Sequence, residues 1–235
     1  MPHPRLLPPG PAASLLAVLA CCFLLPAPAH AALFGDNPVD LPIKEFVASP
    51  NHNNRPAGVT VDTVVIHTTE GSLGGTLSWL QNPVSQVSAH FVIAQNGDLY
   101  QMVNSRKRAW HATYYNARSI GVEMVGYAGR ADTWNDANLA TLASVLAWSS
   151  VEFGIELERP LGNAYGDANN TFRGTGLVGH AQIQPWNKSD PGVFFPWDRV
   201  EADARAVVAA AVPEPGTAAA LLITLGCLCR GRRAA

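Results

Sequence analysis

The chain has 235 residues, a length that suits one domain of ordinary size together with processing segments. Apolar residues make up 48% and charged residues 14%, so a packed core is expected and disorder is not. The net charge of −2 argues against a nucleic-acid partner, because such a partner needs a basic face. All four cysteines lie in two terminal apolar stretches, so a metal ion bound elsewhere would be held by His, Asp or Glu.

Residues 1–31 have the order of a secretory signal peptide. Arg5 supplies the positive start, residues 12–25 form an apolar run, and Ala29 and Ala31 fit the small-residue cleavage pattern. The apolar run is short for a membrane span, which favours a cleaved signal over the alternative, an uncleaved anchor.

Residues 32–59 are rich in proline and asparagine and are expected to form an irregular lead-in. The next part of the chain contains five segments with the β-branched and apolar pattern of strands: residues 61–69, 89–94, 98–103, 120–125 and 177–178. Asn96 and Gly97 separate the second strand from the third, and this dipeptide predicts a hairpin.

Three segments are predicted to be helices: residues 76–81, 135–153 and 198–210. In the longest, Leu139, Leu142 and Leu146 fall at helical spacing, and Gly154 is expected to end the helix. Strands mixed with helices, with one hairpin among them, predict a single α/β domain over residues 60–211, in which helices flank a central mixed β-sheet.

Residues 212–235 close the chain with a Pro-Glu-Pro triplet at 213–215, an apolar run at 217–229 and a basic end. This order resembles the PEP-CTERM sorting signal of Gram-negative bacteria. The resemblance implies export to the periplasm, the outer surface or the extracellular matrix, with transient anchoring in the inner membrane and processing by a sorting protease. A simple tail anchor is the alternative.

Two histidines and an aspartate are candidate metal ligands. His67 comes late in the strand 61–69, and His180 begins a stretch that ends at Asp190. A catalytic zinc ion takes three protein ligands and keeps one open position, and two imidazoles with one carboxylate provide such a set. A lone histidine at a strand end is more often structural, so spacing alone does not decide the question.

Seven short motifs appear in order along the chain: Val-Val-Ile-His-Thr-Thr-Glu-Gly (64–71), Ser-Ala-His-Phe-Val-Ile (88–93), Gly-Asp-Leu-Tyr-Gln (97–101), Ala-Trp-His-Ala (109–112), Ser-Ile-Gly-Val-Glu-Met (119–124), Gly-His (179–180) and Lys-Ser-Asp-Pro-Gly (188–192). Together they resemble the type 2 N-acetylmuramoyl-L-alanine amidase family, which is related to peptidoglycan recognition proteins. The similarity covers about residues 60–210 and implies the fold of that family.

The resemblance implies zinc-dependent hydrolysis of the amide bond between N-acetylmuramic acid and L-alanine in peptidoglycan. Its residue assignments are Zn²⁺ at His67, His180 and Asp190, Glu123 as general base or water-orienting group, and Lys188 as stabiliser of the oxyanion. His90 and His111 match histidines near the family's site, and Trp186 lies on the ligand loop, so these three are candidate substrate contacts.

Each assignment has a plain structural alternative. Glu123 and Lys188 could be solvated side chains, and His111 could serve packing as readily as substrate contact. The chain also has Thr68 and Asn187 where the family often has other residues, which bears on substrate preference. At the level of function, the alternatives are a non-catalytic peptidoglycan-binding module of the same fold and a zinc amidase or peptidase acting on another exported substrate. The expected partner is peptidoglycan, and the expected state is a monomer.

Overall fold

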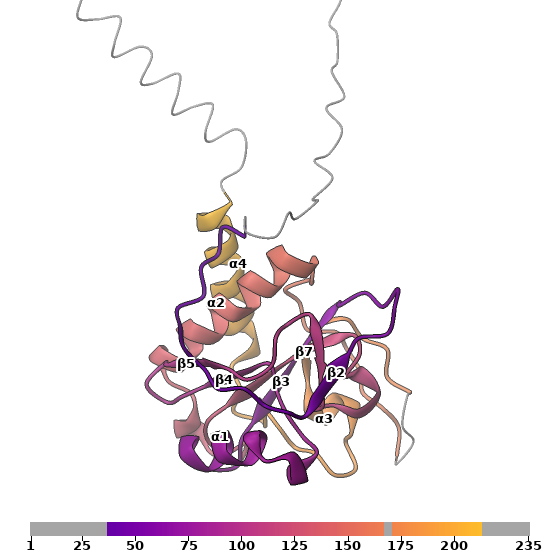
Figure 1. Ribbon diagram of the computed structural model, residues 1–235. Helices are drawn as coiled ribbons and strands as arrows, with labels where there is room; N and C mark the ends of the chain where they lie inside the picture. The colour runs from indigo at the N-terminus through magenta and orange to yellow at the C-terminus, as the bar shows by residue number, and fades with distance from the viewer. Residues whose placement is uncertain (1–36, 167–170, 213–235) are drawn as a thin grey trace, which may run out of the picture.

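The structure is a computed structural model that describes residues 37–166 and 171–212 (Figure 1). The predicted signal peptide and the Pro-Glu-Pro segment lie outside the described residues. Within residues 37–166 and 171–212, no helix combines the length and the apolar character that crossing a membrane requires.

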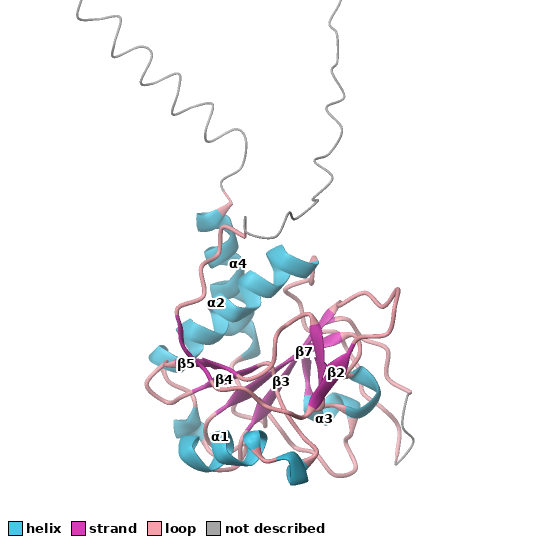
Figure 2. Cartoon of the chain, in the orientation of Figure 1, coloured by secondary structure: helices cyan, strands magenta, loops and turns pink. Residues whose placement is uncertain are grey.

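A six-stranded mixed sheet forms the centre of the domain (Figure 2). Its strands, in spatial order, are β1 (Ile43–Phe46), β5 (Leu99–Gln101), β4 (Phe91–Ile93), β7 (Ser119–Met124), β3 (Thr63–Thr68) and β8 (Gly176–Gly179). The four neighbouring strands β4, β7, β3 and β8 run parallel to one another. Strand β5 is antiparallel to β4, and β1 pairs with β5 in parallel orientation. The predicted mixed sheet and the predicted Asn-Gly hairpin are therefore confirmed. A separate antiparallel pair joins β2 (His52–Asn54) to β6 (Lys107–Ala109).

Helices cover both faces of the sheet. On one side lie α2 (Asp136–Phe153) and α4 (Trp197–Ala211), packed on each other, and on the other side lies α1 (Leu73–Gln81) (Figures 1 and 2). Short helical turns complete the chain: η1 (Pro83–Ser85), η2 (Thr113–Tyr115), η3 (Ala131–Thr133) and α3 (His180–Ile183). The fold thus has the layered α/β architecture that the sequence predicts.

The boundaries of α2 follow from its sequence. The side chain of Asn135 accepts from the backbone N–H of Asn138, whose own side chain accepts from the backbone of Asn135. This reciprocal pair satisfies donors that the first turn leaves free. Gly154 ends the helix in the left-handed conformation, at φ +72°.

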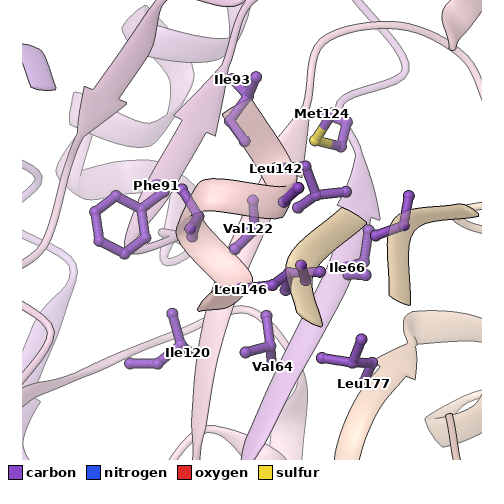
Figure 3. Packing of buried hydrophobic residues seen from close by; sticks show 14 of the residues in the cluster. Val64, Ile66, Phe91, Ile93, Ile120, Val122, Met124, Leu142, Leu146 and Leu177 are labelled. Carbon is purple, nitrogen blue, oxygen red and sulfur yellow. The ribbon is translucent and has the colours of Figure 1, made fainter. Parts of the chain in front are cut away.

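Alternation along the two central strands decides what each face holds. Val64 and Ile66 of β3 point into the core beneath α2, together with Val122 of β7 (Figure 3). Because successive strand side chains point to opposite faces, His67, which follows Ile66, and Glu123, which follows Val122, face away from α2. The side chain of Glu123 is therefore directed to the face that carries the candidate site.

The segment 32–59, expected to be irregular, contains β1 and β2. It is also fastened to the domain by the partly buried guanidinium of Arg55. That group donates to four backbone carbonyls, at 2.6–3.2 Å, which belong to Ser105, Asn116, Ala117 and Ser119. Residues 37–59 of the lead-in are consequently part of the folded unit.

Candidate metal centre

Three side chains converge at the carboxyl edge of the sheet. His67 lies near the end of β3, and His180 follows directly after β8, the parallel neighbour of β3. The carboxyl ends of parallel strands meet at one edge, which brings the two imidazoles together. Asp190 reaches the same point from the loop that follows α3. The backbone carbonyl of Asp190 accepts a hydrogen bond from the N–H of Ala181 at 2.9 Å.

The donor atoms of these side chains form a tight triangle. Nδ1 of His67 lies 2.9 Å from Nδ1 of His180 and 3.0 Å from Oδ2 of Asp190, and the third side measures 3.2 Å. All three residues are buried. In a tetrahedral zinc site with bonds of about 2.0–2.1 Å, ligand atoms lie roughly 3.3–3.4 Å apart. The triangle and its mixture of two nitrogens and one carboxylate oxygen therefore fit a zinc ion.

The protonation states at this centre also suit a divalent cation. Burial, followed by the neighbouring His180, lowers the pKa of His67 to about 4, so this ring is neutral at pH 7. Burial opposes ionisation of Asp190, but the adjoining imidazoles of His180 and His67 outweigh it and hold the pKa of Asp190 below its usual range. Nε2 of His180 lies 2.9 Å from Oε1 of Gln184, an acceptor, so Nε2–H donates there and Nδ1 faces His67 and Asp190.

Glu123 stands beside this centre. It pairs with His67 in the register of β7 against β3, and its Oε2 atom is buried with no hydrogen-bond partner among the described residues. Burial, reinforced by the charge of Asp190, raises the pKa of Glu123 to about 8. A buried carboxyl oxygen without a hydrogen-bond partner indicates that a polar ligand binds in the adjoining space.

That space is a cavity of about 520 Å³ that opens beside the three candidate ligands. Glu123, Lys188 and His111 also line it, so the structure brings these predicted residues together with the metal centre. The cavity extends along the N-terminal part of α1 to Trp79 and to Trp110, which precedes His111.

Two predicted substrate contacts lie elsewhere. His90 is 0% exposed and does not line the cavity. Its Nδ1 accepts from the N–H of Gly121 at 2.9 Å, and its Nε2 lies 3.1 Å from the carbonyl of Lys107. Trp186 is half-buried and packs against the cluster that contains Tyr115. Both positions favour structural roles.

Sequence reasoning missed three residues that line the cavity: Glu70, Trp79 and Trp110. Glu70 had a usable signal, because it follows His67 by three residues at the carboxyl edge of the sheet. Its backbone adopts the left-handed conformation at φ +51°, and Oε1 accepts from the hydroxyl of Thr68 and the N–H of Ala128. Such fixed, uncommon backbone geometry is typical of functional loops.

Comparisons with known proteins agree with this geometry. The family described as N-acetylmuramoyl-L-alanine amidase matches residues 57–193. N-acetylmuramoyl-L-alanine amidase A of Achromobacter lyticus is 34% identical over 151 residues, which cover 62% of this chain and 84% of that protein. The 1,6-anhydro-N-acetylmuramyl-L-alanine amidase AmpD of Escherichia coli (strain K12) is 31% identical over 179 residues, which cover 65% of this chain and 87% of that protein.

Among solved structures, the crystal structure of a selenomethionine derivative of AmpD superposes with a TM-score of 0.52 and 26% identity. The match covers 74% of this chain and 98% of the other. The family match extends over more than half of the chain and contains every residue of the candidate centre. The chain therefore belongs to the N-acetylmuramoyl-L-alanine amidase family and is an enzyme that hydrolyses amide bonds of peptidoglycan.

Proposed function

We propose that this chain is a zinc amidase that cleaves the bond between N-acetylmuramic acid and L-alanine, with zinc held by His67, His180 and Asp190. The observation that carries the proposal is the buried triangle of three donor atoms, 2.9–3.2 Å apart, beside an open cavity. A bound zinc ion lowers the pKa of a water molecule to about 7 and polarises a carbonyl group.

Glu123 is assigned the proton transfers. As a carboxylate it takes a proton from the attacking water while the water oxygen forms its bond to the carbonyl carbon. It then gives this proton to the departing amine of L-alanine as the carbon–nitrogen bond breaks, which returns Glu123 to the carboxylate form. The raised pKa of Glu123 supports the second step, since a carboxyl group with a pKa of about 8 holds a proton long enough to deliver it.

Lys188 is assigned the role of stabilising the negative charge that develops on the carbonyl oxygen of the substrate. It lines the same cavity two residues before Asp190, on the loop that carries this candidate ligand. A single well-placed donor of this kind contributes roughly 3–4 kcal/mol to transition-state stability. The presence of Glu123 and Lys188 beside a full set of candidate ligands favours catalysis over the alternative of a binding-only module.

We further assign the chain to an exported location. The support is in the sequence: the signal-like residues 1–31, and the Pro-Glu-Pro, apolar and basic order of the last 24 residues. A substrate in the cell wall is consistent with that location.

Digestion of purified sacculi tests the reaction. The protein should release stem peptides with a free N-terminal L-alanine and leave the muramic acid intact. Glu123→Gln should keep one zinc ion per chain and lose about 10²–10⁴ in turnover, whereas His180→Ala should lose zinc. Glu45→Gln is a matched control, because Glu45 is exposed in β1 at the far edge of the sheet. Near-normal turnover by Glu123→Gln, or full zinc occupancy in His180→Ala, would contradict the assignment.

A further inference from the structure

We propose that His111 is a positioning residue that fixes the tautomer of His67, so that Nδ1 of His67 is held ready to bind zinc. This inference rests on the proposed function, because it concerns the same metal centre. It comes from an unbroken line of contacts that leads from the candidate ligand back to the main chain: His67, His111, Ser119 and Tyr115.

The direction of each hydrogen bond follows from the far end of this line. The hydroxyl of Ser119 lies 2.7 Å from the carbonyl of Tyr115, which only accepts. Ser119 has one hydroxyl proton and therefore gives it to that carbonyl. The longer contact of 3.1 Å, between Oγ of Ser119 and Nε2 of His111, then has Nε2–H as its donor.

This proton placement determines the next two rings. A neutral imidazole carries one N–H, so His111 with its proton on Nε2 has a lone pair on Nδ1. Nδ1 of His111 lies 3.0 Å from Nε2 of His67 and accepts its proton. The lone pair of His67 is then on Nδ1, the atom that faces His180 and Asp190. The opposite tautomer would place an N–H at the metal position and prevent binding there.

The ring of His111 is held firmly enough for this task. Oδ1 of Asn116 accepts from the backbone N–H groups of His111 and Ala112, at 2.9 and 2.6 Å. On its other side the ring lies against Gly121 of β7, where an added Cβ would come within 2.6 Å of the imidazole. Gly121 thus allows a close approach of ring and strand that any other residue would prevent.

Two variants of nearly equal shape isolate the acceptor. His111→Asn places Oδ1 where Nδ1 was and retains an acceptor for His67, whereas His111→Leu has the same branching and no acceptor. The zinc dissociation constant, measured by competition with a chromogenic chelator, should rise about 10–100-fold in His111→Leu and stay within roughly threefold of the wild type in His111→Asn. Equal affinity in the wild type and His111→Leu, or equal weakening in both variants, would overturn the proposal.

Failure of the proposed function would look different, because the wild-type protein itself would then bind no zinc. Nitrogen-15 NMR of the imidazoles keeps the inference testable even if His111→Leu does not fold. In zinc-loaded wild-type protein, His111 should carry its proton on Nε2 and leave Nδ1 unprotonated. A proton on Nδ1 of His111 would reverse the line of hydrogen bonds and refute the assignment.

Discussion

Acid should destabilise this protein through His90, a residue outside the cavity beside the candidate metal centre. His90 is 0% exposed, and both its ring nitrogens contact main-chain groups. Burial, followed by the charge of Arg55, lowers the pKa of His90 to about 3, although the carbonyl of Lys107 acts in the opposite direction. His52 adds to the lowering, and the ring of His111 lies 5.9 Å away between centroids. The folded state therefore holds His90 neutral.

The sign and size of the effect follow by linkage. In the unfolded chain His90 takes up a proton below about pH 6.5, whereas the folded protein does not until the pH approaches 3. The stabilisation is complete above pH 6.5 and is lost progressively as the pH falls through this window. At 1.36 kcal/mol per pKa unit, the 1.5 units between pH 6.5 and pH 5 correspond to a loss of about 2 kcal/mol from this residue.

Urea unfolding of the wild type and His90→Asn at pH 7.5 and pH 5 measures this contribution. The asparagine keeps an acceptor for the N–H of Gly121 and removes the titrating ring. The wild type should lose about 2 kcal/mol more than the variant between these two pH values. The pH dependence of His67 and of zinc binding is common to both proteins and cancels in the comparison. Parallel losses in wild type and His90→Asn would refute the reasoning.

Three further perturbations address the active centre. Lys188→Met should lower kcat by about 10²–10³ with zinc content unchanged, in keeping with roughly 3–4 kcal/mol for one oxyanion donor; a change confined to KM would instead assign Lys188 to substrate binding. Removal of the metal with a chelator should abolish activity. Zinc at about 1,000 times its dissociation constant should raise the free energy of unfolding by about 4 kcal/mol, so an unchanged Tm on adding zinc would argue against the site. Gly192→Ala should weaken zinc binding and lower the Tm, because Gly192 has φ +92° and its Cβ would lie 2.0 Å from the carbonyl oxygen of Ala128. Gly129→Ala, which meets no heavy atom within 4 Å, should leave both unchanged.

The regular elements with strong local signals were predictable from sequence. The pattern over 135–153 predicts α2 to within one residue, because its apolar spacing, its asparagine cap and Gly154 all agree. The β-branched run at 61–69 predicts β3, which is buried along its whole length. The convergence of His67, His180 and Asp190 came from motif resemblance, since residues so far apart in sequence meet only through the parallel pairing of β3 with β8.

Elements without such signals were not predictable. Strands β1, β2 and β6 have three or four residues each, and the exposed pattern of the first two lacks the alternation that marks a half-buried strand. Helix α1 begins at Leu73, three residues before the predicted start, because Ser72 caps it and two glycines are accommodated in its first turn. His90 and His111 look alike in sequence, yet one is sealed in the interior and the other reaches the cavity. Only the three-dimensional packing of β4, β6 and β7 distinguishes them.

The four backbone carbonyls that accept hydrogen bonds from Arg55 have a practical consequence for the design of shortened or recombined forms of this enzyme. The family match spans residues 57–193 and thus leaves out Arg55, as well as all of α4. A fragment cut at those borders would deprive four carbonyls near the start of β7 of their common donor and uncover the apolar side of α2. We therefore expect the smallest independently folding piece to be larger than the family segment, and a swap of catalytic modules should keep both flanks.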